Sequence, residues 1–198
     1  KPDITQAHIR IGAIGITRKH PDYIPILVAN TILGGGGFSS RLVDEIRVNR
    51  GLTYDITSRF TTRMDRGTFT IATFTKTETT GALIEAILEE LNKFRDDGVV
   101  ESEVNASRQY IAGSFPLGLE GPEALAIQFS GIELFGMPGD FLQTYRRKVR
   151  SVSKDDVMDM MNRYFSSEAL AIVILGNADL IRPQVEQFGP VEQIEYKD

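Results

Sequence analysis

An arginine and a tyrosine seven residues apart, Arg47 and Tyr54, are the side chains whose types and spacing could assist catalysis. A guanidinium offers several planar donors to peptide carbonyls or to a carboxylate. A tyrosine hydroxyl can donate to an oxygen that becomes negative during acyl transfer. The same residue types also have structural uses, because an arginine near a helix end can balance the helix dipole and a strand tyrosine usually packs. Taken alone, the spacing leaves both interpretations open.

The elements around this pair follow from apolar periodicity and from glycine. We expect a helix over Asp22–Leu33 that the glycines Gly34 to Gly37 end. A second helix is expected over Ser40–Asn49, capped by Ser39 or Ser40, with Gly51 in the left-handed position after it. Arg47 then lies beside the apolar stripe of that helix, and the turn at Gly51 returns Tyr54 on a strand. The pair can therefore converge on one cleft.

Strands flank these helices. Residues 8–16 alternate in polarity, which predicts a strand with Gln6, His8 and Arg10 on a polar face. Leu52, Tyr54, Ile56 and Phe60 are expected to share one face of a strand that forms an antiparallel hairpin with residues 68–76. Residues 169–175 read as a strand buried on both faces or as one with a helix above it.

Helical patterns fill the remainder of the chain. They cover residues 83–97, 101–115, 123–135, 141–150, 154–165 and 179–187. Ser153 with Asp156 three residues later predicts a capping box at the start of the helix over residues 154–165. The chain is thus expected to be a single α+β domain over residues 1–198, with an antiparallel or mixed sheet and helices packed largely on one face.

Composition excludes several classes of function. A net charge of -5 and a pI near 5.2 give no basic field for nucleic acid. No apolar run reaches the roughly 18 residues of a membrane span, and no signal-peptide pattern is present. The absence of cysteine removes disulfides and thiolate chemistry, but leaves the compartment open between cytoplasm and periplasm. Because the sequence begins at Lys1 without an initiator Met, we expect it to be a segment of a longer polypeptide.

Common catalytic motifs are missing as well. The two histidines, His8 and His20, belong to no zinc-binding pattern, so no metal site is expected. The glycine run lacks the Gly-Lys-Ser/Thr ending of a phosphate loop, and no Gly-x-Ser-x-Gly elbow is present.

The run Asn30-Thr31-Ile32-Leu33-Gly34-Gly35 through Ser39-Ser40-Arg41-Leu42, Glu45-Ile46-Arg47 and Gly51-Leu52-Thr53-Tyr54 resembles the C-terminal half of pitrilysin/insulinase-type zinc peptidases, the family of mitochondrial processing peptidase. The similarity continues through residues 114–120, 132–136 and 152–176, and so covers essentially the full chain.

In that family two similar α+β halves close around a peptide. One half holds zinc through His-x-x-Glu-His and a distant glutamate, and the other supplies an arginine and a tyrosine. The resemblance implies that Arg47 anchors substrate carbonyls and that Tyr54 donates a hydrogen bond to the reacting carbonyl region. Substrate contacts are implied for Gly35, Gly36, Gly37, Phe38 and Ser39, although the glycines equally suit a helix stop and Phe38 equally suits the core.

The resemblance therefore implies the inactive, substrate-binding half of a zinc endopeptidase, in the α+β processing-peptidase-like fold of bacterial relatives. No zinc is expected in this segment, which should be inactive alone. The implied partners are a zinc-bearing catalytic domain or subunit and a peptide, with no nucleic acid and no membrane, and a homo- or hetero-dimer is compatible. The alternative is a non-catalytic structural or core subunit of a processing-peptidase-like complex.

Overall fold

Four antiparallel strands form a sheet in the order β2-β3-β1-β4, within residues 4–195, the part of the chain that this computed structural model describes. The strands are β1 (Gln6–Ile14), β2 (Ile56–Thr61), β3 (Thr68–Lys76) and β4 (Ala171–Leu175). The α-helices are α1 (Tyr23–Asn30), α2 (Thr80–Asp97), α3 (Glu101–Ser114), α4 (Pro122–Phe135), α5 (Phe141–Ser151), α6 (Lys154–Tyr164) and α7 (Ala178–Val185). Shorter helical segments are η1 (Thr31–Gly35), η2 (Gly37–Ser39), η3 (Val43–Asn49), η4 (Thr77–Thr79), η5 (Phe115–Leu119) and η6 (Glu186–Phe188). The predicted α+β class with an antiparallel sheet is confirmed.

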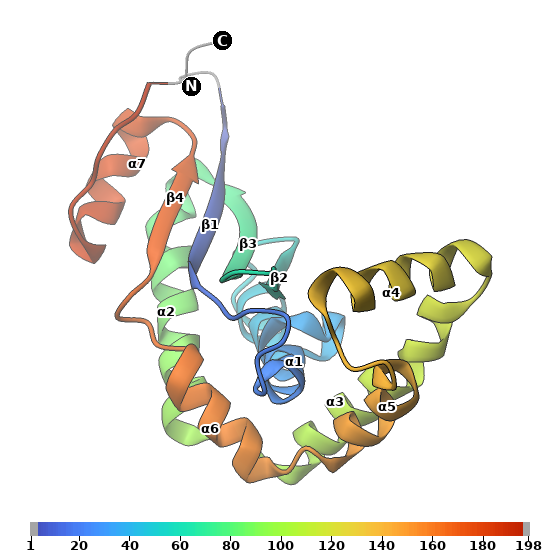
Figure 1. Ribbon diagram of the computed structural model, residues 1–198. Coiled ribbons are helices and arrows are strands. Elements are labelled where there is room, and N and C mark those ends of the chain that lie inside the picture. The colour runs from blue at the N-terminus through green and yellow to red at the C-terminus, as the bar shows by residue number, and fades with distance from the viewer. Residues whose placement is uncertain (1–3, 196–198) are drawn as a thin grey trace.

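The sheet has one covered face and one open face. Alternate β1 side chains, from Ala7 to Ile11, are fully buried on the side where α2 runs behind the sheet (Figure 1). Gln6, His8 and Arg10 point to the opposite face and are exposed, as the period of two predicts. Helices therefore cover one face of this sheet.

Aromatic rings fill the centre of the core between the hairpin and the helices. Phe165 makes edge contacts with Phe60, Phe69 and Phe94, at centroid distances of 5.3, 5.2 and 5.5 Å. Phe60 and Phe69, opposite each other on β2 and β3, stack at 4.9 Å. Such pairs add to the burial of their apolar area, so the ring cluster joins the hairpin to α2 and to the end of α6.

Most of the predicted elements are present, including the hairpin of β2 and β3 and the capping box between Ser153 and Asp156 at the start of α6. A strand is present within residues 169–175, as predicted, but the expectation that it is buried on both faces is wrong. β4 is an edge strand, and on one of its faces Val173 is 65% and Leu175 46% exposed. On its other face Ile172 and Ile174 are partly buried against the core, so the apolar run has only one covered face.

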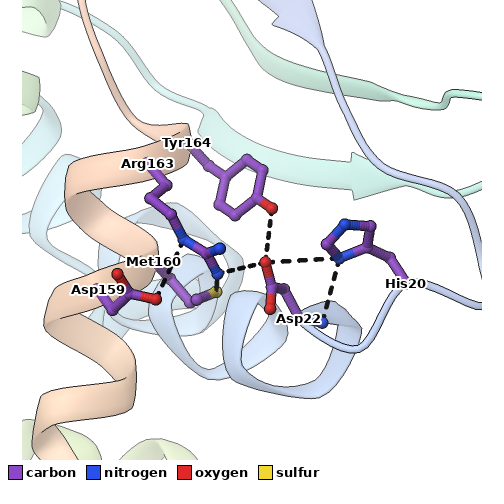
Figure 2. A network of polar contacts seen from close by, with 6 residues as sticks. All are labelled: His20, Asp22, Asp159, Met160, Arg163 and Tyr164. Atoms are coloured by element: carbon purple, nitrogen blue, oxygen red, sulfur yellow. Dashed lines mark hydrogen bonds and ion pairs between the residues drawn. The ribbon is translucent and has the colours of Figure 1, made fainter.

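A polar network joins the start of α1 to the end of α6 (Figure 2). The carboxylate of Asp22 accepts hydrogen bonds from the Tyr164 hydroxyl at 2.6 Å and from the Arg163 guanidinium. His20 lies 3.5 Å from the same carboxylate, and its Nδ1 accepts the backbone N–H of Asp22. Desolvation, followed by the bond to Asp22, raises the pKa of Tyr164 to about 12. His20, predicted to lie in a turn, thus helps to fix the N-terminal end of α1.

At its other end α1 continues as the π-helical turn η1, which presses against β2. Gly34 lies so close to β2 that a Cβ there would be 2.6 Å from Ser58 Oγ and 2.8 Å from Ser58 N. Asn30 Nδ2 donates to Ser58 O at 3.0 Å, and Ser58 Oγ donates to Asn30 Oδ1 at 2.8 Å. The expectation that the glycines end the helix is therefore only partly right, because the chain stays helical through Gly35.

A second link fixes the segment that follows the glycines. Arg41 donates from Nε and Nη2 to the two oxygens of Glu103 at 2.7 and 2.8 Å, and from Nη2 to Gly98 O at 2.9 Å. Glu103 also accepts the N–H of Val100 at the start of α3. A bidentate pair of this kind holds orientation as well as distance, so the chain after the glycine run is tied to α3.

None of the helices in the described range is both long enough and apolar enough to span a bilayer.

Replacing Gly34 with alanine should lower the free energy of unfolding by about 1–3 kcal/mol, because the new methyl group has no space against the Ser58 backbone. Gly113→Ala in α3 is the control. A Cβ at that position meets nothing within 4 Å, so this change should raise the free energy of unfolding by about 0.5–1 kcal/mol. Urea unfolding of both variants measures the difference, and a Gly34→Ala variant as stable as the native chain would refute the close contact.

The Glu103→Gln variant should lose about 1–2 kcal/mol of unfolding free energy at pH 7. Burial raises the pKa of Glu103, but the hydrogen bonds from Arg41 and Val100 outweigh it, so the net pKa is lowered. Such a carboxyl stabilises the fold above its unfolded pKa of about 4.3, and this stability disappears as the pH falls through the folded value.

Urea unfolding at a series of pH values checks this sign. The difference between native chain and Glu103→Gln should shrink progressively below about pH 4.3. Glu85→Gln is the control, since Glu85 is exposed and has no hydrogen bond or ion pair in the described range. A difference that stays constant down to acidic pH would contradict the account.

Candidate functional site

The turn between Arg47 and Tyr54 is set by a π-helical segment and one left-handed glycine. η3 ends with Arg50 N–H donating to Glu45 O and Leu52 N–H donating to Ile46 O, at 3.1 and 3.0 Å. Gly51 between them has φ +62°, a conformation that glycine adopts without strain. The predicted left-handed Gly51 is confirmed, and the chain turns at residues 50–52, after the end of η3.

The predicted capping of the helix before this turn is wrong. Helical geometry starts at Arg41, but the hydroxyls of Ser39 and Ser40 donate backwards, to Gly36 O and Gly37 O at 3.2 and 2.7 Å. A local bond to a preceding carbonyl competes with capping for the same hydroxyl. In this structure it closes the short η2 turn.

Arg47 is the arginine on this turn that has no carboxylate partner in the described range. Its guanidinium carbon lies 4.6 Å from the ring centre of Phe38, a cation–π contact. Phe38 itself is 77% exposed. Of its two predicted roles, as a substrate contact or as a core residue, the core role is therefore excluded. The aromatic ring holds the guanidinium at the surface while leaving its N–H donors available.

The neighbouring arginines are engaged. Arg50 Nε bonds Glu45 at 2.9 Å and its Nη2 bonds Glu89 at 2.8 Å. Hydrogen bonds from Asn49 and then Arg50 lower the pKa of Glu45, so this carboxylate is charged and occupied at neutral pH. Arg41 is likewise held by Glu103. Nearby carboxylates therefore pair with Arg41 and Arg50, whereas Arg47 has no such partner in the described range.

Tyr54 is presented from a segment whose backbone is fixed. Thr53 Oγ1 donates to Phe74 O on β3 at 2.6 Å, and Thr75 Oγ1 donates to Leu52 O at 2.6 Å. The prediction that Tyr54 shares one face of a strand with Ile56 is wrong, because β2 starts only at Ile56. Tyr54 is 78% exposed, whereas Ile56 is buried. The threonine bonds replace strand pairing here and leave the phenol ring in solvent.

The glycines before Phe38 have a structural reason of their own. A Cβ on Gly35 would lie 2.6 Å from Asn30 Nδ2, and one on Gly36 would lie 2.6 Å from Thr31 O. Gly37 is exposed with φ +64°. These contacts favour the helix-end role for Gly35 and Gly36, whereas substrate contact by Gly35, Gly36, Gly37, Phe38 and Ser39 stays a prediction.

Neither histidine is placed for a metal ion. The His8 ring lies 5.9 Å from the Phe74 ring on the open face of the sheet, and His20 belongs to the Asp22 network. Across residues 4–195 no three His, Asp or Glu side chains gather in a way that could hold a metal. The donor groups in this described part of the chain do not fit a zinc site.

Two shallow pockets lie along α3. One, of about 250 Å³, is lined by residues of the glycine segment and of α3, among them Gly36, Ser39 and Tyr110. The other, of about 320 Å³, is lined by residues that include Arg108 and Arg150. Arg47 and Tyr54 line neither of these pockets, and Tyr54 is exposed at the surface.

Sequence reasoning overlooked two cations on the open face of the sheet, Arg59 on β2 and Lys76 on β3. Both are exposed, and the strand registers place them on the same face as Gln6, His8 and Arg10. Extending the alternation of residues 8–16 to the hairpin would have found them.

Comparison with known proteins places the chain among peptidase-like sequences. Residues 1–111 match the family model described as the peptidase M16 inactive domain. An uncharacterized zinc protease of Bacillus subtilis is 28% identical over 174 residues, which are 87% of this chain and 42% of that protein. A protein of Helicobacter pylori described as a non-peptidase homolog is also 28% identical, over 88% of this chain and 40% of its own length.

A solved structure of the same family has a similar fold. The crystal structure of a peptidase M16 inactive domain from Pseudomonas fluorescens has a TM-score of 0.80 and 27% identity, covering 86% of this chain and 41% of that chain. The chain spans about two fifths of the length of these relatives. The chain belongs to the family of the peptidase M16 inactive domain.

Proposed function

We propose that this chain is the substrate-binding half of a zinc-dependent endopeptidase, holding a peptide opposite a zinc-bearing catalytic half. Membership in an inactive-domain family supports the assignment of the chain to the half without metal. The lack of a metal-holding group in the described range is consistent with zinc being held by the partner. Bound there, the zinc would supply an activated water for attack on a peptide carbonyl.

The observation that carries this proposal is the contrast between Arg47 and its neighbours. Arg41 and Arg50 are bound by carboxylates, whereas Arg47 is held over the exposed Phe38 ring without one. An unpaired guanidinium on a fixed turn can donate to backbone carbonyls of a bound peptide. Tyr54, exposed on an anchored segment, can donate to the carbonyl oxygen on which negative charge develops.

Arg47→Ala and Tyr54→Phe should each reduce peptide cleavage by the two halves together by about 10²- to 10³-fold, because each removes a positioned donor. The Tyr54 change should act mainly on kcat, whereas the Arg47 change should also raise KM. A fluorogenic peptide assay with the catalytic half added measures both constants.

Arg147→Ala is the matched control, because Arg147 is exposed on α5 and has no carboxylate partner in the described range. Circular dichroism verifies that all variants keep the fold. Cleavage at the native rate by both Arg47→Ala and Tyr54→Phe would refute the proposed roles.

An apolar helix supports the proposal that a second half packs against this one. In α4 no residue is buried, and Ile127, Phe129 and Leu134 are 64, 56 and 60% exposed. Figure 1 shows α4 at the right of the sheet, running above α3 and α5. A helix that is apolar all round is normally covered. We infer that the catalytic half covers α4.

Ile127→Glu should weaken association with the catalytic half by at least about tenfold, because the interface would then bury an unpaired carboxylate. Leu180→Glu on α7 is the control, an equally exposed apolar residue at 56% on another helix. Sedimentation or titration calorimetry measures the affinity. Equal effects of the two changes would exclude α4 as the contact.

A non-catalytic scaffold role is the second candidate, and the Helicobacter pylori relative described as a non-peptidase homolog favours it. A scaffold needs no unpaired donor at residue 47. The cleavage assay separates the candidates, since a scaffold would give no turnover with any catalytic half.

A further inference from the structure

We propose that the open face of the sheet selects acidic peptides, through Arg10 on β1 and Arg59 on β2. This inference rests on the proposed function, because it names the class of peptide that the same half would hold. It concerns the sheet face beside the Arg47–Tyr54 turn and not the turn itself.

The first observation is a one-sided distribution of charge. The strand registers place sixteen side-chain positions on the open face, and those that carry a permanent charge are Arg10, Arg59 and Lys76. No aspartate or glutamate occupies this face of the four paired strands. The whole chain has a net charge of -5, so this face is opposite in sign to the molecule.

The second observation is that these cations are unpaired. Arg10 donates only to the backbone oxygen of its neighbour Ile9, at 2.9 Å, and Arg59 has no ion pair in the described range. By contrast, Arg41, Arg50 and Arg163 each have a carboxylate partner. Unpaired guanidiniums are the groups that bind a carboxylate bidentately and strongly.

The positions of the two arginines suit one extended peptide. Arg10 lies opposite Ala72 of β3, and Arg59 lies opposite Thr70 of the same strand. Two strand spacings and a two-residue offset put their Cα atoms roughly 12 Å apart. An extended chain covers that distance in about four residues, so carboxylates separated by three or four residues can reach both.

The face between and around them has room for apolar side chains too. Ala72 and Thr70, between the arginines, are short. Ile14, Val173 and Leu175 are 71, 65 and 46% exposed along the same face. We therefore expect the preferred peptide to carry apolar residues in addition to its two acidic ones.

The open face is continuous with the candidate site. Phe74, whose carbonyl fixes Thr53 beside Tyr54, carries its own ring on the open face against His8. The exposed acids closest in sequence to this end lie just outside the paired strands. Asp55 directly precedes β2, and Glu78 comes two residues after Lys76, the last residue of β3. Arg10 and Arg59 lie further along the strands and form no ion pair with either acid. The positive charges of the two arginines therefore remain available to a bound peptide.

The test compares three labelled peptides of equal length that carry Glu, Gln or Lys at the same two positions, four residues apart. Fluorescence anisotropy measures their binding to the two assembled halves after zinc is chelated, so that no peptide is cleaved. The Glu peptide should bind at least about tenfold more tightly than the Lys peptide, and this ratio should fall as salt is raised.

Arg10→Gln and Arg59→Gln should each reduce the Glu-to-Lys ratio about threefold, and the double variant about tenfold, while Arg10→Glu should shift preference toward the Lys peptide. Arg147→Gln should leave the ratio unchanged. The Arg47→Ala variant should weaken all three peptides alike, which separates this proposal from the proposed function. Equal binding of the three peptides, or a ratio unaffected by Arg10 and Arg59, would overturn it.

Discussion

The contact between Gly34 and Ser58 is the point on which the arrangement of this molecule depends. Without a Cβ at residue 34, the end of α1 can press its backbone against β2, where Asn30 and Ser58 exchange hydrogen bonds. This contact sets where the next turns of chain begin. The Arg41–Glu103 pair then ties those turns to α3. Arg47 and Tyr54 follow these two links in the sequence, and the links therefore help to determine their positions.

The distribution of carboxylates separates structural arginines from available ones. Arg41, Arg50 and Arg163 join elements through ion pairs. Arg47 lies over an aromatic ring, which orients a guanidinium without using its donors. The guanidinium donors of Arg47 therefore remain available to peptide carbonyls or carboxylates. Binding does not require an internal ion pair of this arginine to be broken first, which would cost free energy.

Much of the fold could be predicted from the sequence, because strong local patterns agree with the tertiary structure. The hairpin, the capping box at Ser153 and the left-handed Gly51 are examples. The predictions were wrong where contacts between distant segments determine the burial or the hydrogen-bond partner of a residue. The exposure of β4 depends on what covers it, and Ser40 bonds a preceding carbonyl instead of capping a helix. Tyr54 looked like a strand residue, but the side chains of Thr53 and of Thr75 on β3 hold its segment outside the regular ladder. The site pair itself was named from a family resemblance, since spacing alone also suited structural roles.

The central claim is that the turn carrying Arg47 and Tyr54 faces a bound peptide. A photoreactive benzoylphenylalanine in place of Tyr54, irradiated with the assembled halves and a labelled peptide, tests it most directly. The account predicts a covalent adduct between residue 54 and the peptide, and none when the same group replaces Leu180 on α7. Absence of the adduct at residue 54, with peptide bound, would contradict the account.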